Sequence, residues 1–406
     1  MADTRHIGIA GAGLLGRLLA WQLTRAGHRV SVFDASAGPQ PVPRSQAGEP
    51  YVPTAAAFTA AGMLSPLAEL DNAEPAVAAL GWRSLELWQQ FARELGRPEL
   101  VQVQGSLLVA HRHDLGSAQR VLDRLRAATA TPEWQAASPQ ETVRKLDAST
   151  LRELEPSVQG PAHAWMLPGE GFIDPVGAMA AMYQAATGVS WHWGQRVLAV
   201  QAGKAGEGGG ALLLHDGRVL AFDVVIDVRG VGAKAAASAP MPENVRALSA
   251  EGGFSANGAG SHTGADAVRG VRGEVIWLDC PGHGLQRPVR LLHPRHRVYI
   301  VPRSARDILV GASEIESEDR SPVSLRSATE LMAAAHSVVP ALAEARILKL
   351  DVNLRPAMPD NNPLLAWEGD RLTINGLFRH GWLLAPPLVE LALAADGAKA
   401  AGLAKP

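Results

Sequence analysis

Three glycines near the start of the chain have the spacing of a phosphate-binding turn. Gly11, Gly13 and Gly16 form G-x-G-x-x-G. Glycines at these positions permit a tight turn, let backbone N–H groups approach a pyrophosphate, and let the next helix pack closely against the preceding strand. Asp34 follows Gly16 by 18 residues, where a carboxylate can accept the hydroxyls of an adenine nucleotide's ribose. The motif predicts dinucleotide binding; the acid disfavours NADP, whose 2′-phosphate it would repel, and leaves NAD and FAD open.

A second candidate for chemistry is Arg355, which lies in the proline-rich stretch 353–365, "NLRPAMPDNNPLL". A guanidinium suits a carboxylate because it makes two parallel, charge-assisted hydrogen bonds. Pro356 disfavours the α region for Arg355 and biases it towards an extended backbone. An arginine beside prolines is more often a solvated turn residue, so the stretch alone leaves a surface charge and an anion-binding residue both open.

The elements around the glycine turn form one βαβ unit. Residues 7–10 are apolar, leucines at helical spacing follow from Leu15, Gly27 ends the helix, and "RVSVFD" alternates up to Asp34. These patterns predict strand, helix and strand in that order. The N-terminus of the helix then faces the predicted phosphate site, which favours an anion there.

The remaining patterns predict an α/β fold with an inserted sheet. Asp174 and Pro175 have the signature of a helix start, with the acid as N-cap and the proline at the first helical position. One βαβ unit, many later strands and a closing helix indicate an open, doubly wound parallel sheet with a second, mostly antiparallel sheet inserted into it. We expect further helices near 75–96, 115–128, 324–337 and 388–402, strands within 100–110, 196–230, 274–278, 297–303 and 308–313, and irregular polar segments at 38–53 and 251–270.

Size and composition exclude several classes of protein. A chain of 406 residues is long for one core and favours two domains. The formal net charge of −2 offers no basic field for nucleic acid or an anionic membrane. The single cysteine, Cys280, rules out an internal disulfide and a cysteine-based metal site, and it suits a reducing compartment. No apolar stretch of about 20 residues and no signal peptide is evident, and the histidine-rich segments 111–113 and 293–296 lack a carboxylate at metal-ligand spacing. We therefore expect a cytoplasmic protein with no metal, nucleic-acid or membrane partner.

Five further motifs follow one another along the chain: "AAGMLSP" (60–66), "GFIDP" (171–175), "VYIVPR" with "ILVGAS" (298–313), "NLRPAMPDNNPLL" (353–365) and "GLFRHGWLLAP" (376–386). Together with the glycine turn, they resemble the D-amino-acid oxidase superfamily of FAD enzymes, and within it the glycine oxidases of thiamine synthesis (ThiO type). The resemblance spans nearly the whole chain and implies the FAD fold that this superfamily shares with glutathione reductase. It implies a discontinuous FAD-binding domain from 1–75, 155–235 and 345–406, and a substrate-binding domain from 76–154 and 236–344.

The resemblance also implies which residues hold FAD. The glycine turn and Asp34 would hold its ADP half, Val197 would give main-chain contacts to the adenine, and small residues from Ala60 onwards would lie along the isoalloxazine ring. Backbone donors near Gly376 would reach the pyrimidine edge of the flavin. Cys280 does not match a covalent attachment position, so we expect non-covalent FAD. The implied cofactor residues are Gly11, Ala12, Gly13, Leu14, Leu15, Gly16, Asp34, Ala60, Ala61, Gly62, Met63, Val197, Arg229, Gly230, Gly232, Gly376, Arg379, His380, Gly381, Trp382 and Leu383.

For the substrate, the resemblance implies a carboxylate clamp of Arg355 and Tyr299, with Arg379 also lining the site. It implies oxidation of glycine or a small D-amino acid to a 2-oxo acid and ammonia, with dioxygen reduced to hydrogen peroxide. Alternatives that stay open are a sarcosine-type amine oxidase, a D-amino-acid dehydrogenase with another electron acceptor, an NAD-dependent dehydrogenase and a non-catalytic flavin protein. The sequence does not fix the oligomeric state, and a homo-oligomer is compatible with it. The chain departs from the family pattern in a longer segment at 35–59 and in carrying Leu377 and His380 where relatives often have His and Asn.

Overall fold

The computed structural model describes residues 4–41, 54–71, 73, 75–131, 142–203, 208–234, 267–293 and 297–403. Most of the predicted polar loop at 251–270 lies outside the described residues, as does much of the 35–59 segment.

The N-terminal βαβ unit belongs to a six-stranded sheet in the order β19-β20-β13-β1-β2-β9. All neighbours in it pair in parallel except β19 and β20, which form an antiparallel hairpin. The predicted open parallel sheet is therefore confirmed. Its strands are β1 (His6–Ala10), β2 (Arg29–Phe33), β9 (Ser190–His192), β13 (Val224–Asp227), β19 (Leu364–Glu368) and β20 (Arg371–Asn375).

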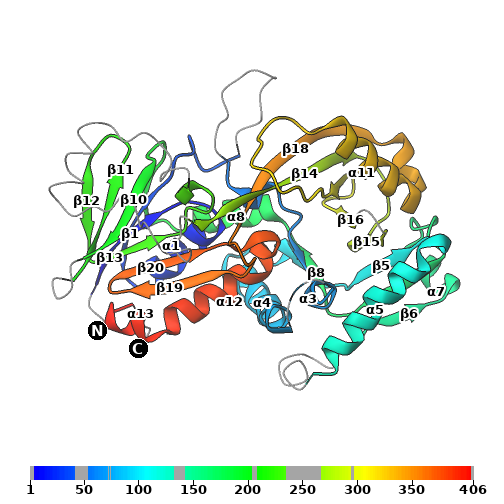
Figure 1. The fold of residues 1–406 in the computed structure, drawn as a ribbon, viewed down its shortest axis with the longest axis horizontal. Helices are drawn as coiled ribbons and strands as arrows, with labels where there is room; N and C mark the ends of the chain where they lie inside the picture. The colour runs from blue at the N-terminus through cyan, green and yellow to red at the C-terminus, as the bar shows by residue number, and fades with distance from the viewer. Residues whose placement is uncertain are drawn as a thin grey trace.

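Alternation along these strands creates two cores. In β1, Ile7 and Ile9 pack into the large core that also contains the apolar faces of four helices, whereas Ala10 packs into a small core against a three-stranded meander. Side chains of consecutive strand residues point to opposite faces, so one strand serves both layers. The layers lie in one half of the molecule, where both termini also lie (Figure 1). The helices are α1 (Leu14–Arg25), α4 (Pro75–Glu94), α8 (Pro175–Ala185) and α12 (Gly381–Ala394), and the meander is β10 (Val197–Ala202), β11 (Gly210–Leu214) and β12 (Val219–Phe222).

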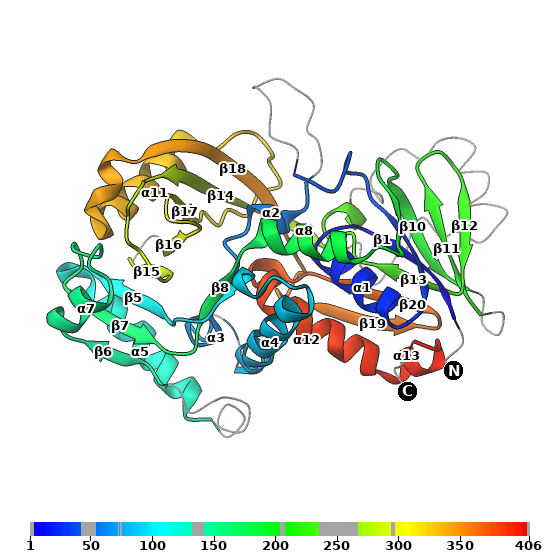
Figure 2. The same ribbon diagram turned by 180° about the vertical axis from the view of Figure 1, so that it is seen from behind.

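The other half of the molecule is built on an eight-stranded sheet in the order β18-β14-β17-β16-β15-β5-β7-β6. All neighbouring strands pair antiparallel except β15 and β5, which confirms the inserted, mostly antiparallel sheet. From either side, the two halves lie next to each other and are joined by several crossings of the chain (Figures 1 and 2). The strands are β5 (Ser106–Ala110), β6 (Arg144–Leu146), β7 (His163–Leu167), β14 (Arg269–Asp279), β15 (Val289–Leu292), β16 (Arg297–Pro302), β17 (Asp307–Gly311) and β18 (Arg346–Ala357).

The two faces of this sheet have different partners. One face packs against α11 (Leu325–Val338) in its own core, while residues such as Val275 and Leu309 on the other face contact Ala61 and Phe172 from the cofactor side. The predicted N-cap of α8 is confirmed, because the Asp174 carboxylate accepts a hydrogen bond from the backbone N–H of Val176. The remaining elements are α2 (Ala56–Thr59), α3 (Pro66–Glu69), α5 (Leu115–Thr129), α7 (Ala148–Leu154), α13 (Asp396–Ala400), β3 (Met63–Leu64), β4 (Val101–Gln102), β8 (Gly171–Ile173), and the short 3-10 helices η1 (Pro98–Leu100), η2 (Arg112–Asp114), η4 (Pro340–Glu344) and η5 (Phe378–His380).

Two local features differ from the sequence expectations. The stretch around Arg355 is the end of the long strand β18, and the chain turns only after Met358, whose carbonyl accepts from the N–H of Asn361. The closing helix α12 begins at Gly381, seven residues before the predicted start at 388. The predicted start was too late because Pro386 and Pro387 normally interrupt a helix, whereas α12 continues through both.

The strands β7 and β18 belong to the eight-stranded sheet, although their residues fall in the ranges predicted for the cofactor domain. The domain boundaries stay a prediction. Within the described residues, no helix is both long enough and apolar enough to cross a bilayer.

Candidate active site

A single cavity joins the glycine turn to the eight-stranded sheet. It has a volume of about 1030 Å³ and is lined by residues from both halves of the molecule. Of the implied cofactor and clamp residues, all line it except Ala12 and Gly16, which lie in the same turn as Gly11 and Gly13. The structure therefore brings the predicted cofactor residues and the predicted clamp into one space.

The three glycines of the turn have two different reasons to be glycine. Gly11 has a φ of +107°, and a Cβ there would lie 2.7 Å from the carbonyl oxygen of Val228. A Cβ on Gly16 would lie 1.9 Å from the carbonyl oxygen of Gly11. A Cβ on Gly13 would meet only Ala55, at 3.8 Å, and would enter the cavity instead. The first two let the helix pack on the strand, and the third leaves backbone room for a ligand.

The start of α1 is prepared for an anion. Its N-cap is Gly13, no side chain caps it and no acidic residue lies in its first turn, so the first N–H groups of the helix are free to face the cavity. Asp34, at the end of β2, also lines the cavity; its carboxylate accepts from the N–H of Ala12 at 2.6 Å and of Ser36 at 2.7 Å. These bonds fix the carboxylate beside the turn.

A second turn enters the cavity after β13. Gly230 has a φ of +56°. The Arg229 guanidinium binds to neighbouring protein groups: it pairs with Asp227 at 2.6 Å and donates to the carbonyl of Val197 at 3.0 Å. Burial raises the pKa of Asp227, but the charge of Arg229 outweighs it, and the net pKa is below its usual value. The Arg229 side chain therefore holds the meander to the sheet and leaves the backbone of the turn to the cavity.

The segment Ala60–Met63 also lines the cavity. Gly62 has a φ of +64°, and a Cβ there would lie 2.4 Å from the carbonyl oxygen of Ile173. Arg303 donates to the carbonyls of Ala61 and Ile173, the latter at 3.0 Å. Burial lowers the pKa of Arg303 to about 10. One buried guanidinium thus fixes the backbone of this segment to β8.

The predicted clamp residues lie over two glycines, Gly273 and Gly311, in the eight-stranded sheet. Tyr299 pairs directly with Gly311 on β17, and its ring lies over that glycine, where a Cβ would be 2.7 Å from the hydroxyl oxygen. Arg355 lies over Gly273 on β14, where a Cβ would be 2.6 Å from its Cζ atom. Because glycine has no side chain, both positions leave space above the sheet, and the phenol and the guanidinium meet there.

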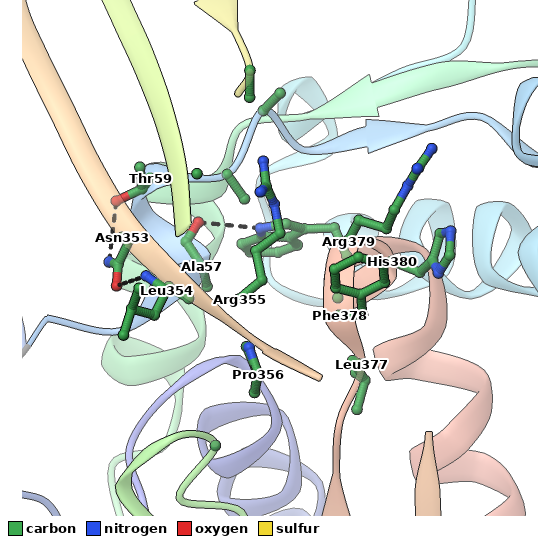
Figure 3. Close-up of a pocket in the computed structure, with 18 of the residues that line it drawn as sticks. Ala57, Thr59, Asn353, Leu354, Arg355, Pro356, Leu377, Phe378, Arg379 and His380 are labelled. Carbon is green, nitrogen blue, oxygen red and sulfur yellow. Dashed lines mark hydrogen bonds between the residues drawn. The ribbon is translucent and has the colours of Figure 1, made fainter. Parts of the chain in front are cut away.

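Arg355 is available to a ligand. Its Nη1 donates to the carbonyls of Ser313 at 3.0 Å and Arg272 at 3.3 Å, and Tyr299 is within hydrogen-bonding reach. Among the described residues no carboxylate lies within ion-pair distance of it. Burial lowers the pKa of Arg355 and raises the pKa of Tyr299, so a cation and a neutral phenol face the cavity. Figure 3 shows Arg355 and Arg379 projecting in the same direction from β18 and from the segment before α12.

Arg379 belongs to a network centred on a residue that the sequence did not reveal. The Glu69 carboxylate contacts Nη2 of Arg379 at 3.2 Å, Nη2 of Arg290 at 3.0 Å and Nε2 of His380 at 2.9 Å. Burial alone would raise the pKa of Glu69, but Arg379, Arg290 and His380 together hold it well below its usual value. Arg379 also lies 3.5 Å from Glu314, whose side chain is half exposed. Glu69 is therefore an anion whose oxygens are fully engaged.

Comparison with known proteins shows the family of the chain. The family model described as FAD dependent oxidoreductase matches residues 6–394. The chain belongs to this family of FAD-dependent oxidoreductases. It is 34% identical over 381 residues to a putative thiamine biosynthesis oxidoreductase ThiO of Rhizobium etli, covering 94% of this chain and 93% of that protein. It is 25% identical over 403 residues to the glycine oxidase of Geobacillus kaustophilus, covering 95% and 91%. The crystal structure of glycine oxidase from G. kaustophilus superposes with a TM-score of 0.73 at 23% identity, covering 99% and 96%.

Proteins of this FAD-dependent family bind FAD, and the cavity of this chain fits that cofactor. The open backbone at Gly13, the uncapped start of α1 and the carboxylate of Asp34 suit the pyrophosphate and ribose of its ADP half. The start of α12 is a second helix N-terminus at the cavity; it has no acidic residue in its first turn. Cys280 is buried outside the cavity lining, and burial raises the pKa of its thiol.

Sequence reasoning missed the residues that support the site from a distance. Glu69 and Arg290 are 221 residues apart in the chain, and neither lies in a pattern that predicts their contact. Gly273 and Gly311 did carry a signal, because glycines inside strand patterns mark places where something approaches the sheet closely.

Proposed function

We propose that this protein oxidises glycine or a small D-amino acid to the 2-oxo acid and ammonia, with FAD as cofactor and dioxygen reduced to hydrogen peroxide. The observation that carries the proposal is the meeting of Arg355 and Tyr299 above two strand glycines, in the cavity that also contains the dinucleotide-binding turn. The similarity to a thiamine biosynthesis oxidoreductase further supports a role in forming the thiazole precursor of thiamine.

In this proposal the six-stranded half holds FAD and the eight-stranded half holds the substrate. The glycine turn, Asp34 and the turn at Gly230 take the ADP half. The segment Ala60–Met63 and the start of α12 border the flavin ring, with backbone N–H groups of α12 as donors. These assignments agree with the lining of the cavity, and they place the clamp of Arg355 and Tyr299 across from the flavin.

The residues of the chain act by binding and orientation. Arg355 takes the substrate carboxylate with its fork of donors, and Tyr299 adds a neutral O–H donor. FAD held in this cavity would supply the two-electron oxidation at the substrate Cα, with dioxygen as the final electron acceptor. The resulting imine is hydrolysed by water to the 2-oxo acid and ammonia. The chain needs no general base for this, because the amine reacts in its neutral form, and Glu69, the buried carboxylate nearest to that role, has its oxygens occupied by Arg290, Arg379 and His380. The rate enhancement comes from orientation and electrostatics.

The test is an anaerobic screen of the purified protein. We expect the flavin absorbance to bleach with glycine or a small D-amino acid and to return with air, together with an equivalent of peroxide. Bleaching by sarcosine in preference to primary amines would favour the amine-oxidase alternative. Bleaching without peroxide on aeration would indicate a dehydrogenase. A flavin that no amino acid reduces would refute the proposal.

A further inference from the structure

Of the arginines that line the cavity, Arg290, Arg355 and Arg379 surround Tyr299, and among the described residues Arg355 is the one of these three that contacts no carboxylate. Arg290 and Arg379 both contact Glu69, through different oxygens, and Arg379 also lies near Glu314. In the part of the chain that the structure describes, Arg355 has backbone carbonyls and Tyr299 as partners and no carboxylate. The positive charge available to a substrate is therefore concentrated at Arg355.

The Glu69 network lies beside the clamp and not in a remote part of the protein. Arg290 on β15 pairs directly with Tyr299 on β16, so the two side chains leave the same face of the sheet. The charges of Arg290, Arg379 and Arg355 all act on the Tyr299 hydroxyl. A substrate held by its carboxylate at Arg355 would thus have its side chain close to Arg290 and Arg379.

Arg290 and Arg379 come from different elements and hold one carboxylate between them. This arrangement could bind the second carboxylate of a dicarboxylic substrate, but the Glu69 carboxylate already occupies it. Arg290 comes from β15 and Arg379 from η5, and the Glu69 side chain spans them with only 10% of its surface exposed. A second carboxylate on a substrate would need the same donors and the same space. While Glu69 is present, it would meet a buried negative charge at close range instead.

We infer that Glu69 is a specificity-determining residue that restricts the substrate to amino monocarboxylates, by occupying and neutralising a second carboxylate site at Arg290 and Arg379. The inference rests on the proposed function, because it assumes that an amino acid binds at Arg355. It extends that function by naming the charge class of the substrate: amino acids with one carboxylate, such as glycine or D-alanine, and not D-aspartate or D-glutamate.

The experiment compares D-aspartate with D-alanine in the FAD-loaded protein and three variants. The measured quantity is the ratio of kcat/KM for D-aspartate to kcat/KM for D-alanine. Glu69→Ala removes the charge and opens the space, Glu69→Gln removes the charge and keeps the size, and Glu314→Gln is the matched control, since it removes the same charge from a half-exposed partner of Arg379. We expect the ratio to rise on the order of 10-fold or more in Glu69→Gln and further in Glu69→Ala, and to change by less than about threefold in Glu314→Gln.

The outcomes separate this inference from the proposed function. A merely structural role for Glu69 would lower both activities and leave the ratio unchanged, which would overturn the inference. Wild-type protein that oxidises D-aspartate as well as D-alanine would also overturn it, and this measurement needs no variant. Wild-type flavin that neither amino acid nor glycine reduces would instead refute the proposed function, and the inference would fall with it.

Discussion

The bare position beneath Arg355 gives a direct test of the carboxylate clamp. In Gly273→Ala, the new Cβ would lie 2.6 Å from Cζ and 2.6 Å from Nη2 of Arg355. Ordinary contacts between such atoms are about 3.5–4.0 Å, so the guanidinium must move by about 1 Å. The substitution removes no charge from the cavity and changes only the position of the Arg355 guanidinium.

The expected effect is a loss of catalysis without a loss of fold. A displacement of about 1 Å in a positioning group lowers the rate on the order of 100-fold. The clash falls on the end of a flexible side chain, so the strand pairing of β14 with β18 can persist. We therefore expect kcat/KM for the preferred amino acid to fall on the order of 100-fold, with FAD content and Tm close to those of the wild type.

The assay is peroxide formation under air, with FAD content read from the flavin absorbance and Tm from thermal unfolding. The matched control is Gly116→Ala in α5, where an added Cβ meets nothing within 4 Å. Binding of acetate, which has the carboxylate but not the amine, can be followed by its effect on the flavin spectrum and should weaken in parallel with kcat/KM. Wild-type activity in Gly273→Ala would show that the position of Arg355 does not matter, and the clamp would be wrong.

Three further substitutions test the clamp, the glycine turn and Glu170, a buried acid outside the cavity lining. Arg355→Ala should retain FAD but lose roughly 2–5 kcal/mol of substrate and transition-state binding, or about 30- to several-thousand-fold in kcat/KM; normal turnover would contradict the clamp. Gly16→Ala should fail to retain FAD through gel filtration, because its Cβ would lie 1.9 Å from the carbonyl oxygen of Gly11, whereas a yellow variant would contradict the account of the turn. Glu170 is fully buried, and burial raises its pKa to about 7. The folded protein keeps a proton on Glu170 up to a pH of about 7, whereas the unfolded chain loses it at about 4.5. The free energy of unfolding is therefore highest below pH 4.5 and falls as the pH rises to about 7. Wild-type stability should fall across that range by about 3 kcal/mol relative to Glu170→Gln, in urea melts at several pH values; parallel pH profiles would contradict this.

Local patterns in the sequence predicted those parts of the site that depend on local structure. The glycine turn followed from one βαβ unit, and the extended backbone of Arg355 followed from Pro356, since a residue before proline avoids the α region. The structure has Arg355 in β18. The start of α12 was missed because Pro386 and Pro387 interrupt its pattern, although the helix continues through them.

The contacts among distant charges could not be predicted in the same way. Glu69 follows the "AAGM" motif by a few residues, and its three partners come from β15 and the segment before α12. An acid in such a place reads as a solvated helix end unless the fold is known. Tertiary packing decides that Glu69 is buried, and burial decides that its charge must be paired.

The clamp and the cofactor-side wall of the cavity are linked through one strand. Tyr299 lies in β16, and Arg303 follows directly after that strand ends at Pro302. Arg303 donates to the carbonyl of Ala61, so the segment that borders the predicted flavin ring is held by the same strand that presents the phenol. In the proposed arrangement, the short stretch of backbone from Tyr299 to Arg303 would therefore set the distance from the clamp to the flavin. Hydride transfer depends steeply on that distance. One strand that carries Tyr299 and leads directly to Arg303 would keep the distance constant, which gives a physical reason for the two residues to lie so near each other in the chain.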